Sequence, residues 1–229
     1  MISWSHSRVA EFLKCGFRMW CVSIAKKVKF VENKFTREGK KVHTMFEERI
    51  RDGTPFPPEY AKLEKIAAQI LAMPGDKLVE NQLALDKEFK PCGYKDWNRA
   101  WCRVIIDILV LNGKKAFAGD YKTGNPDYLD GNQLELTAAV LFETFPELHE
   151  VTTGYIWTKK GELTDEDITI YTRDQRGELW DRQLERYAEL YHANEKNEWP
   201  KRPSNFNCGY CDVNKAGLCD AAAVKYKGR

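Results

Sequence analysis

The chain has 229 residues, and its 36 Lys and Arg residues nearly balance 34 Asp and Glu residues. This balance excludes binding of nucleic acid through a strong global field, so any DNA contact must come from a local patch. The sequence is 43% hydrophobic and 12% aromatic, which is typical of a soluble globular protein. Its apolar runs are too short to cross a bilayer, and the N-terminus does not resemble a signal peptide. We therefore expect a cytoplasmic protein with no membrane partner.

Hydrophobic periodicity predicts helices and strands in a mixed order along the chain. The predicted helices span residues 7–23, 36–51, 58–72, 128–144 and 173–197. The predicted strands span residues 78–89, 100–111, 116–121, 151–158 and 167–171. Residues 200–229 are expected to be loop-like and rich in cysteine. This order predicts an α/β or α+β fold around a small mixed sheet.

Asp107 is the most informative residue, because it interrupts an apolar strand that should be covered on both faces. A buried carboxylate is costly unless it is paired or binds a cation. Asn112 and Gly113 are a strong signal for a two-residue hairpin turn. Such a turn pairs the residues that flank it and sets Asp107 opposite Ala118.

Asp120 and Lys122 lie two residues apart near the end of the second hairpin strand. The same register sets Ile105 opposite Asp120, so that Asp107, Asp120 and Lys122 share one face of the sheet. The two carboxylates then become diagonal neighbours, about 7–8 Å apart. Their repulsion favours a bound divalent cation, and oxygen ligands suit Mg²⁺ or Mn²⁺. Asp120 and Lys122 alone are equally compatible with a strand-edge ion pair.

A predicted helix offers further ligands. His43 and Glu47 lie four residues apart on one helix face, with Gly39 one turn earlier. His43 is also compatible with an ordinary helix surface. It becomes a candidate metal ligand if this helix packs against the end of the sheet that carries the carboxylates. Glu80, in the preceding strand region, is another candidate ligand or a surface acid.

Taken in chain order, these residues form a specific set: Gly39-x3-His43-x3-Glu47, Asp107, Asp120-Tyr121-Lys122-Thr123-Gly124 and Gln133. The set resembles the RecB-like branch of the PD-(D/E)XK nucleases, and the resemblance covers nearly the whole chain. This branch includes the RecB and AddB nuclease domains, CRISPR-associated RecB-like exonucleases and phage exonucleases. The resemblance implies one domain, 1–229, with a restriction-endonuclease-like core at 36–199. An N-terminal helix, 1–35, and a Cys-rich clasp, 200–229, would flank this core.

The resemblance also implies roles for single residues. The implied metal ligands are His43, Asp107, Asp120 and the carbonyl of Tyr121. Lys122 would stabilise or orient the attacking water, and Gln133 would position the scissile strand or support Lys122. Single-stranded DNA or duplex ends would be the substrate, and a helicase or recombination protein is a possible partner.

Seven cysteines in a chain without a signal peptide argue against a disulfide framework. Cys208, Cys211 and Cys219 follow the spacing C-x2-C-x7-C, and the first pair has metal-ligand spacing. The resemblance implies that Cys15 joins these three around a [4Fe–4S] cluster. Zinc held by the four cysteines is the alternative, and an empty thiol cluster is a third possibility. The remaining cysteines are assigned to packing: Cys21, Cys92 and Cys102.

The sequence thus predicts a metal-dependent DNA nuclease, most simply an exonuclease. Two other functions remain open. One is a DNA-binding or adaptor protein that keeps the fold without catalysis, although such a protein would be expected to have lost Asp107, Asp120 or Lys122. The other is a structural metal-clasp domain, which leaves the buried carboxylate of Asp107 unexplained.

Overall fold

The computed structural model describes residues 2–29, 32–124, 131–164 and 168–227. The chain forms two compact units. The first unit is Lys34–Gln183, and the second combines Ile2–Asn33 with Leu184–Arg229. Among the described residues, no helix is both long and apolar enough to cross a membrane.

A six-stranded mixed sheet forms the centre of the first unit, with the order β2-β1-β3-β4-β5-β6. Its strands are β1 (Asp76–Leu85), β2 (Pro91–Cys92), β3 (Cys102–Asn112), β4 (Lys115–Lys122), β5 (Glu150–Trp157) and β6 (Ile168–Thr172). Strands β4 and β5 are parallel, and the other neighbours are antiparallel. The predicted mixed sheet is confirmed. The two-residue strand β2 was not predicted, because so short a segment has no periodicity to read.

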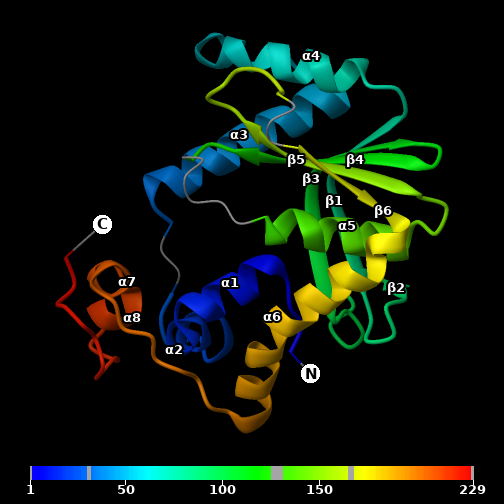
Figure 1. Cartoon of the computed structure of the whole chain (residues 1–229). Coiled ribbons are helices and arrows are strands. Elements are labelled where there is room, and N and C mark those ends of the chain that lie inside the picture. The colour runs from blue at the N-terminus through cyan, green and yellow to red at the C-terminus, as the bar shows by residue number, and fades with distance from the viewer. Residues whose placement is uncertain (1, 30–31, 125–130, 165–167, 228–229) are drawn as a thin grey trace. The chain divides into compact units, whose positions relative to one another are not determined.

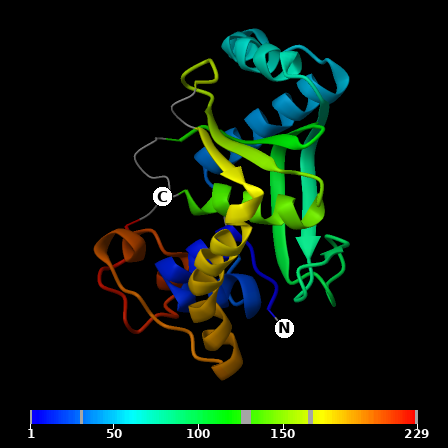
Figure 2. The same cartoon turned by 45° about the vertical axis from the view of Figure 1, so that its right-hand side comes forward.

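Helices cover both faces of this sheet, as Figure 1 shows for α3, α4 and α5. The helices of the first unit are α3 (Lys34–Asp52), the 3₁₀ helix Pro58–Leu63, α4 (Glu64–Ala72), α5 (Asn132–Thr144), the 3₁₀ turn Arg173–Gln175 and the start of α6 (Arg176–Lys196). Helices α3 and α4 lie on one side and α5 on the other, which is also clear in Figure 2. Residues 128–130 of the predicted helix 128–144 lie outside the described residues.

The core between the sheet and α3–α4 is built from alternate strand residues. Ile108 and Val110 of β3 and Tyr121 of β4 point to this side, where they pack with Phe46 and Ile70. The Tyr121 ring stacks on Phe46, with 4.0 Å between centroids and an interplanar angle of 11°. Because side chains alternate along a strand, the odd residues of β3 and the even residues of β4 point to the opposite face.

The β3–β4 hairpin forms as predicted, but its turn is displaced by one residue. Asn112 pairs with Lys115, so the turn residues are Gly113 and Lys114. Gly113 has φ of +58°, a conformation that favours glycine. The prediction that Asp107 faces Ala118 is therefore wrong. Each residue of β3 pairs with a residue of β4 two positions further along the chain than predicted. A shift by an even number of residues preserves the alternation of side chains, so every side chain keeps its predicted face.

In the second unit, a break divides the first predicted helix. The helices are α1 (His6–Lys14), α2 (Gly16–Met19), the π-helical turn Trp20–Ile24, the end of α6, α7 (Asn205–Gly209) and α8 (Asp212–Lys215). The prediction of one helix over residues 7–23 is wrong, because Cys15 is extended, with φ of −169° and ψ of 105°. Gly16 then packs so closely that an added Cβ would lie 2.8 Å from both Phe12 and Pro200. The expectation that 200–229 is entirely loop-like is also corrected by α7 and α8.

Candidate metal centre and the adjoining lysine

Three side chains from three elements of the first unit converge on one point. They are His43 of α3, Glu80 of β1 and Asp107 of β3, whose donor atoms all lie within 4.8 Å of one another. In the described part of the chain, this is the one group of three or more His, Cys, Asp or Glu residues so arranged. One imidazole and two carboxylates fit Mn²⁺ well, and carboxylate oxygens also suit Mg²⁺.

The orientation of His43 leaves one ring nitrogen for a metal ion. Its Nε2 lies 3.0 Å from the carbonyl oxygen of Tyr121, which can only accept a hydrogen bond. Its Nδ1 therefore faces the carboxylates, 3.3 Å from Asp107 and 3.8 Å from Glu80. Such a second hydrogen bond typically fixes the ring of a metal-binding histidine.

The protonation of His43 follows from the same contacts. Burial by itself lowers the pKa of His43, but the contacts with Asp107 and Glu80 outweigh it and raise the pKa to about 10. Without a bound cation, the protonated imidazole thus neutralises part of the acidic charge around it. A metal ion that binds Nδ1 must displace this proton, so metal binding is coupled to proton release.

Glu80 reaches the centre through an unusual backbone conformation. Its φ is +47°, which is rare for a residue other than glycine within a strand. Its neighbours on both sides pair with β3, but Glu80 itself does not. Such a conformation costs on the order of 1–3 kcal/mol and tends to occur at functional sites. Glu80 was only a secondary candidate in the sequence, because no local pattern indicates this distortion.

Asp107 is buried and held by the backbone of the neighbouring strand. Its side chain is 9% exposed, and its Oδ2 accepts a hydrogen bond of 2.8 Å from the backbone N–H of Tyr121. The β3–β4 ladder ends at the pair Ile108–Gly119, so the next step along this register sets Asp107 beside Asp120. Directly opposite residues are closer than the diagonal neighbours that the sequence predicted.

Asp120, Lys122 and Gln133 form a connected network beside the metal centre. Lys122 Nζ lies 2.6 Å from one Asp120 oxygen and donates a 3.1 Å hydrogen bond to Gln133 Oε1. Gln133 of α5 in turn donates from Nε2 to the other Asp120 oxygen. Tyr155 of β5 was not predicted, and its ring centroid lies 5.1 Å from Lys122 Nζ. Only the parallel pairing of β4 with β5 brings it there.

The environment of Asp120 disfavours its charged form. Burial, followed by the charge of Asp107, raises the pKa of Asp120 to about 6, although Lys122 acts in the opposite direction. A cation between the two carboxylates would relieve this repulsion. Glu80, rather than Asp120, completes the three-residue group. The role of Asp120 as a metal ligand stays a prediction.

The other predicted residues lie at the margin of the site. Glu47 forms an ion pair of 2.6 Å with Arg51 on the same helix. The carbonyl of Tyr121, predicted as a metal ligand, contacts His43. A Cβ at Gly39 would meet the Thr123 hydroxyl at 3.5 Å, so the start of α3 does pass beside the end of β4, at an ordinary contact distance.

The four predicted clasp cysteines share one small cavity in the second unit. Its volume is about 30 Å³, and its lining includes Cys15, Cys208, Cys211 and Cys219. Ligands of a single zinc ion would lie close together, since each Zn–S bond is about 2.3 Å. Within the described ranges, no three cysteine sulfurs lie within 4.8 Å of one another. The cysteines therefore surround a common space without forming a ready single-ion site.

All seven cysteines, each within the described residues, are free thiols. Burial raises the pKa of both Cys21 and Cys102, which agrees with their predicted packing role. Cys92 is half-buried at the short strand β2.

Comparison with known proteins gives little further information. No protein-family model matches the chain, and no curated protein matches it. Among solved structures, the chain is similar to one described as "Crystal structure of SSO0001", at 13% sequence identity and a TM-score of 0.47. The match covers 97% of this chain and 88% of that chain. So distant a likeness carries no argument about activity or ligands.

Proposed function

We propose that this protein is a divalent-metal-dependent deoxyribonuclease that hydrolyses phosphodiester bonds in single-stranded DNA or at duplex ends. The observation that carries the proposal is the adjacency of two groups. A trio suited to Mn²⁺ or Mg²⁺, with donor atoms within 4.8 Å of one another, lies beside a lysine held by Asp120 and Gln133. This arrangement supports the PD-(D/E)XK resemblance, including a restriction-endonuclease-like core, at the level of side chains.

The chain's own residues suggest how the reaction is divided among them. A bound divalent ion would lower the pKa of a water molecule and neutralise charge on the phosphate. His43, Glu80 and Asp107 would hold that ion. Lys122 would orient the attacking water and stabilise negative charge on the phosphate. The water oxygen forms a bond to phosphorus, one P–O bond to the neighbouring nucleotide breaks, and the leaving oxygen takes up a proton.

Gln133 would act as a positioning residue. It bonds to both Asp120 and Lys122, so it restricts where the ammonium group of Lys122 can lie. Positioning of this kind matters, because a misplacement of about 1 Å can reduce a rate about 100-fold.

For the cysteines, we propose a [4Fe–4S] cluster, with zinc as the alternative. The shared cavity supports the grouping of the four thiols, and a four-iron cluster spaces its thiolates more widely than one zinc ion does. A cytoplasmic location, where thiols stay reduced, suits seven free cysteines. Anaerobic purification followed by iron, sulfide and zinc analysis would distinguish the two occupants.

The nuclease proposal is tested with end-labelled single-stranded and duplex DNA, incubated with Mn²⁺, with Mg²⁺ or with a chelator. We expect cleavage that requires the metal and shortens the labelled strand from one end. Binding of DNA without cleavage under all of these conditions would instead favour the adaptor function. A helicase or recombination partner would be sought only after cleavage is established.

A further inference from the structure

A second arrangement on the sheet of the first unit is not explained by the metal centre. Arg103 lies on β3, and its guanidinium carbon is 3.9 Å from the ring centroid of Trp97 and 5.5 Å from that of Tyr94. Arg103 is only 8% exposed, yet its Nε and Nη2 have no hydrogen-bond partner. A buried cation without a carboxylate partner is costly. The indole face of Trp97 compensates for part of this cost.

Trp97 itself is 73% exposed, although it is a large aromatic residue. The loop that carries it is held by hydrogen bonds rather than by burial. Asp96 Oδ1 accepts from the backbone N–H groups of Asn98 and Arg99, at 3.1 and 3.2 Å. The guanidinium group of Arg103 covers one side of the indole. The tryptophan therefore offers flat aromatic surface to solvent from a supported position.

Between Arg103 and Asp107, the sheet exposes the side chains of Ile105 and Gln82 to solvent. Arg103, Ile105 and Asp107 are alternate residues of β3 and share one face of the strand. Ile105 is 42% exposed, and its cross-strand partner Gln82 is exposed as well. Asp107 lies four residue steps along the strand from Arg103, a distance of about 13 Å at 3.3 Å per residue. Stacked nucleotides advance about 3.4 Å each, so this distance corresponds to at most about four nucleotides.

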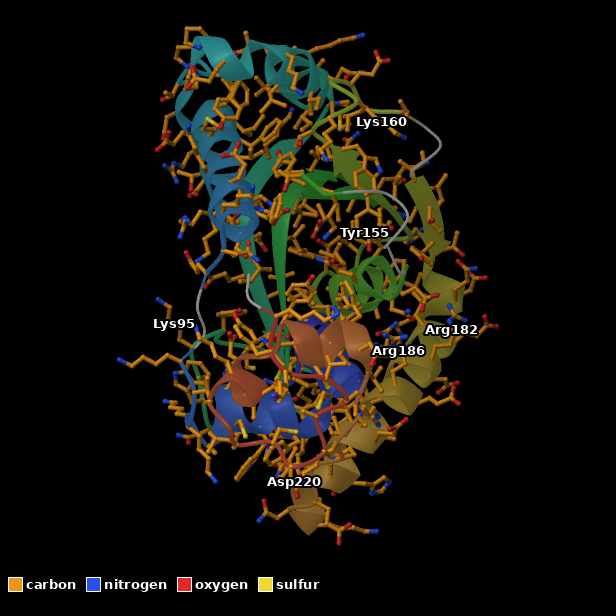
Figure 3. The ribbon with its side chains drawn as sticks, turned by 90° about the vertical axis from the view of Figure 1, so that its left-hand side faces the viewer. Lys95, Tyr155, Lys160, Arg182, Arg186 and Asp220 are labelled. Atoms are coloured by element: carbon orange, nitrogen blue, oxygen red, sulfur yellow. The ribbon has the colours of Figure 1, made fainter. Side chains whose placement is uncertain are left out.

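The charge near Trp97 suits a polyanion. Arg103 has no ion pair within the described residues, so its positive charge is not neutralised locally. Lys95, from the same loop, extends away from the ribbon into solvent in Figure 3. Sequence-tolerant sites for single strands combine positive charge with aromatic rings on which bases stack. Here both occur about four nucleotides from the metal centre.

We propose that Trp97, supported by Arg103, is a base-stacking subsite for single-stranded DNA whose backbone crosses Ile105 and Gln82 to the metal centre. This inference rests on the proposed function for the identity of its ligand. It adds to that function a preference for unpaired nucleotides, because a base inside a duplex cannot expose its face to Trp97.

The test is binding of a fluorescent thymidine oligonucleotide of about 12 nucleotides, a length within the usual range of such sites. Binding is measured by fluorescence anisotropy without divalent metal, so that no cleavage intervenes. Trp97→Ala should weaken binding about tenfold, the effect expected for the loss of one stacked base. Trp97→Phe should retain most of the affinity. Phe206→Ala is the matched control, because Phe206 is a 78% exposed aromatic residue of the second unit, and it should change affinity less than twofold.

A second ligand separates base stacking from backbone contacts. On an abasic oligonucleotide of the same length, wild type and Trp97→Ala should bind equally, because no base is present to stack. Equal binding of the thymidine oligonucleotide by both proteins would overturn the inference, as would a tenfold difference that persists on the abasic strand. A wild-type protein that does not bind the thymidine strand would also overturn it.

The outcomes distinguish this inference from the nuclease proposal. Metal-dependent cleavage with affinity independent of Trp97 would retain the nuclease and remove the stacking subsite. Base-dependent binding through Trp97 without any cleavage would retain the subsite and remove the nuclease. Thermal melting of Trp97→Ala should stay within about 4 °C of wild type, because the 73% exposed indole contributes little packing and its removal costs mainly the contact with Arg103.

Discussion

The carboxylate site of the first unit and the cysteine site of the second differ in what holds their donor atoms. His43, Glu80 and Asp107 lie on a long helix and two paired strands, and their donor atoms lie within 4.8 Å without any ion. Of the four cysteines, Cys15 lies at the end of α1, Cys208 within the short helix α7, Cys211 directly before α8 and Cys219 in a loop. These four cysteines, all among the residues that the structure describes, line one cavity, but no three of their sulfur atoms lie as close together as the donor atoms of the first site. The donor atoms of the first site are preorganised by the fold, whereas the proposed cluster of the second site would have to draw its cysteines together.

This difference has an energetic counterpart. The carboxylate site keeps a strained Glu80 and two neighbouring acids, and the packing of the sheet offsets their cost. The cysteine segment has short helices and much exposed chain, so it contributes less packing of its own. Metal binding in such a segment is coupled to folding. Loss of a ligand should therefore affect activity in the first unit and stability in the second.

The largest expected effect is on catalysis. Lys122→Ala should reduce metal-dependent cleavage at least about 100-fold, the loss typical of removing one group that stabilises transition-state charge. DNA affinity should change little, because most of it comes from other backbone contacts. Single-turnover cleavage and anisotropy binding measure the two quantities separately.

Lys114→Ala is the matched control, since Lys114 is an exposed lysine in the β3–β4 turn of the same unit. The Lys114→Ala protein should cleave DNA at a rate within about twofold of wild type if Lys122, and not any nearby lysine, acts in the reaction. Normal cleavage by Lys122→Ala would mean that Lys122 takes no part in the reaction. The carboxylate site would then no longer be distinguished from the cysteine site by an effect on activity.

The next effect is on stability and belongs to the cysteine site. Cys208→Ala should lower the melting temperature of the metal-loaded protein by about 4–8 °C, which corresponds to roughly 2 kcal/mol in a chain of this size. The reason is the loss of one thiolate of the proposed cluster, which would tie the Cys-rich segment to Cys15. Differential scanning calorimetry and metal analysis, made on the same samples, would provide the check.

Two controls define the meaning of that result. Cys92→Ala removes a half-buried thiol of the first unit and should leave metal content unchanged. After the bound metal is removed, wild type and Cys208→Ala should melt within about 2 °C of each other, since only packing of a small thiol then separates them. A wild-type protein that contains neither iron nor zinc would rule out the clasp and leave the carboxylate site unaffected.

The smallest effect is a change in pH dependence. The pKa of Asp120 is raised to about 6 by burial and by Asp107, so its ionisation disfavours the folded state. The stability that its protonated form contributes is present below about pH 4 and is lost as the pH rises through about 6. Metal-free Asp120→Asn should therefore be more stable than wild type above pH 6, by on the order of 1 kcal/mol.

Chemical denaturation at several pH values between 4 and 8 would measure this difference. The difference should grow between about pH 4 and 6 and then stay constant. Added Mn²⁺ should reduce or reverse it, because a cation relieves the repulsion that the substitution removes. If the difference in stability does not change with pH, ionisation of Asp120 does not destabilise the folded protein. The carboxylate site would then lack the electrostatic repulsion that distinguishes it from the cysteine site.

The sequence by itself determined the class of the fold and most of its elements. Long amphipathic segments and the Asn112–Gly113 signal depend on local interactions, so periodicity and turn chemistry predicted them within a few residues. The same reasoning placed Asp107, Asp120 and Lys122 on one face. That conclusion survived a displaced turn, because a shift of two positions preserves the side-chain alternation of a strand.

Only the tertiary structure decided which groups meet. Glu80 joins His43 and Asp107 through a local distortion of β1 that no sequence pattern encodes. Tyr155 reaches Lys122 through the parallel pairing of β4 and β5, which are separated in sequence by α5. The stacking of Trp97 on Arg103 depends likewise on how one loop folds over its strand. Local propensity acts over a few residues, whereas these contacts depend on the register of strands and the packing of distant segments, and those are fixed only when the whole unit folds.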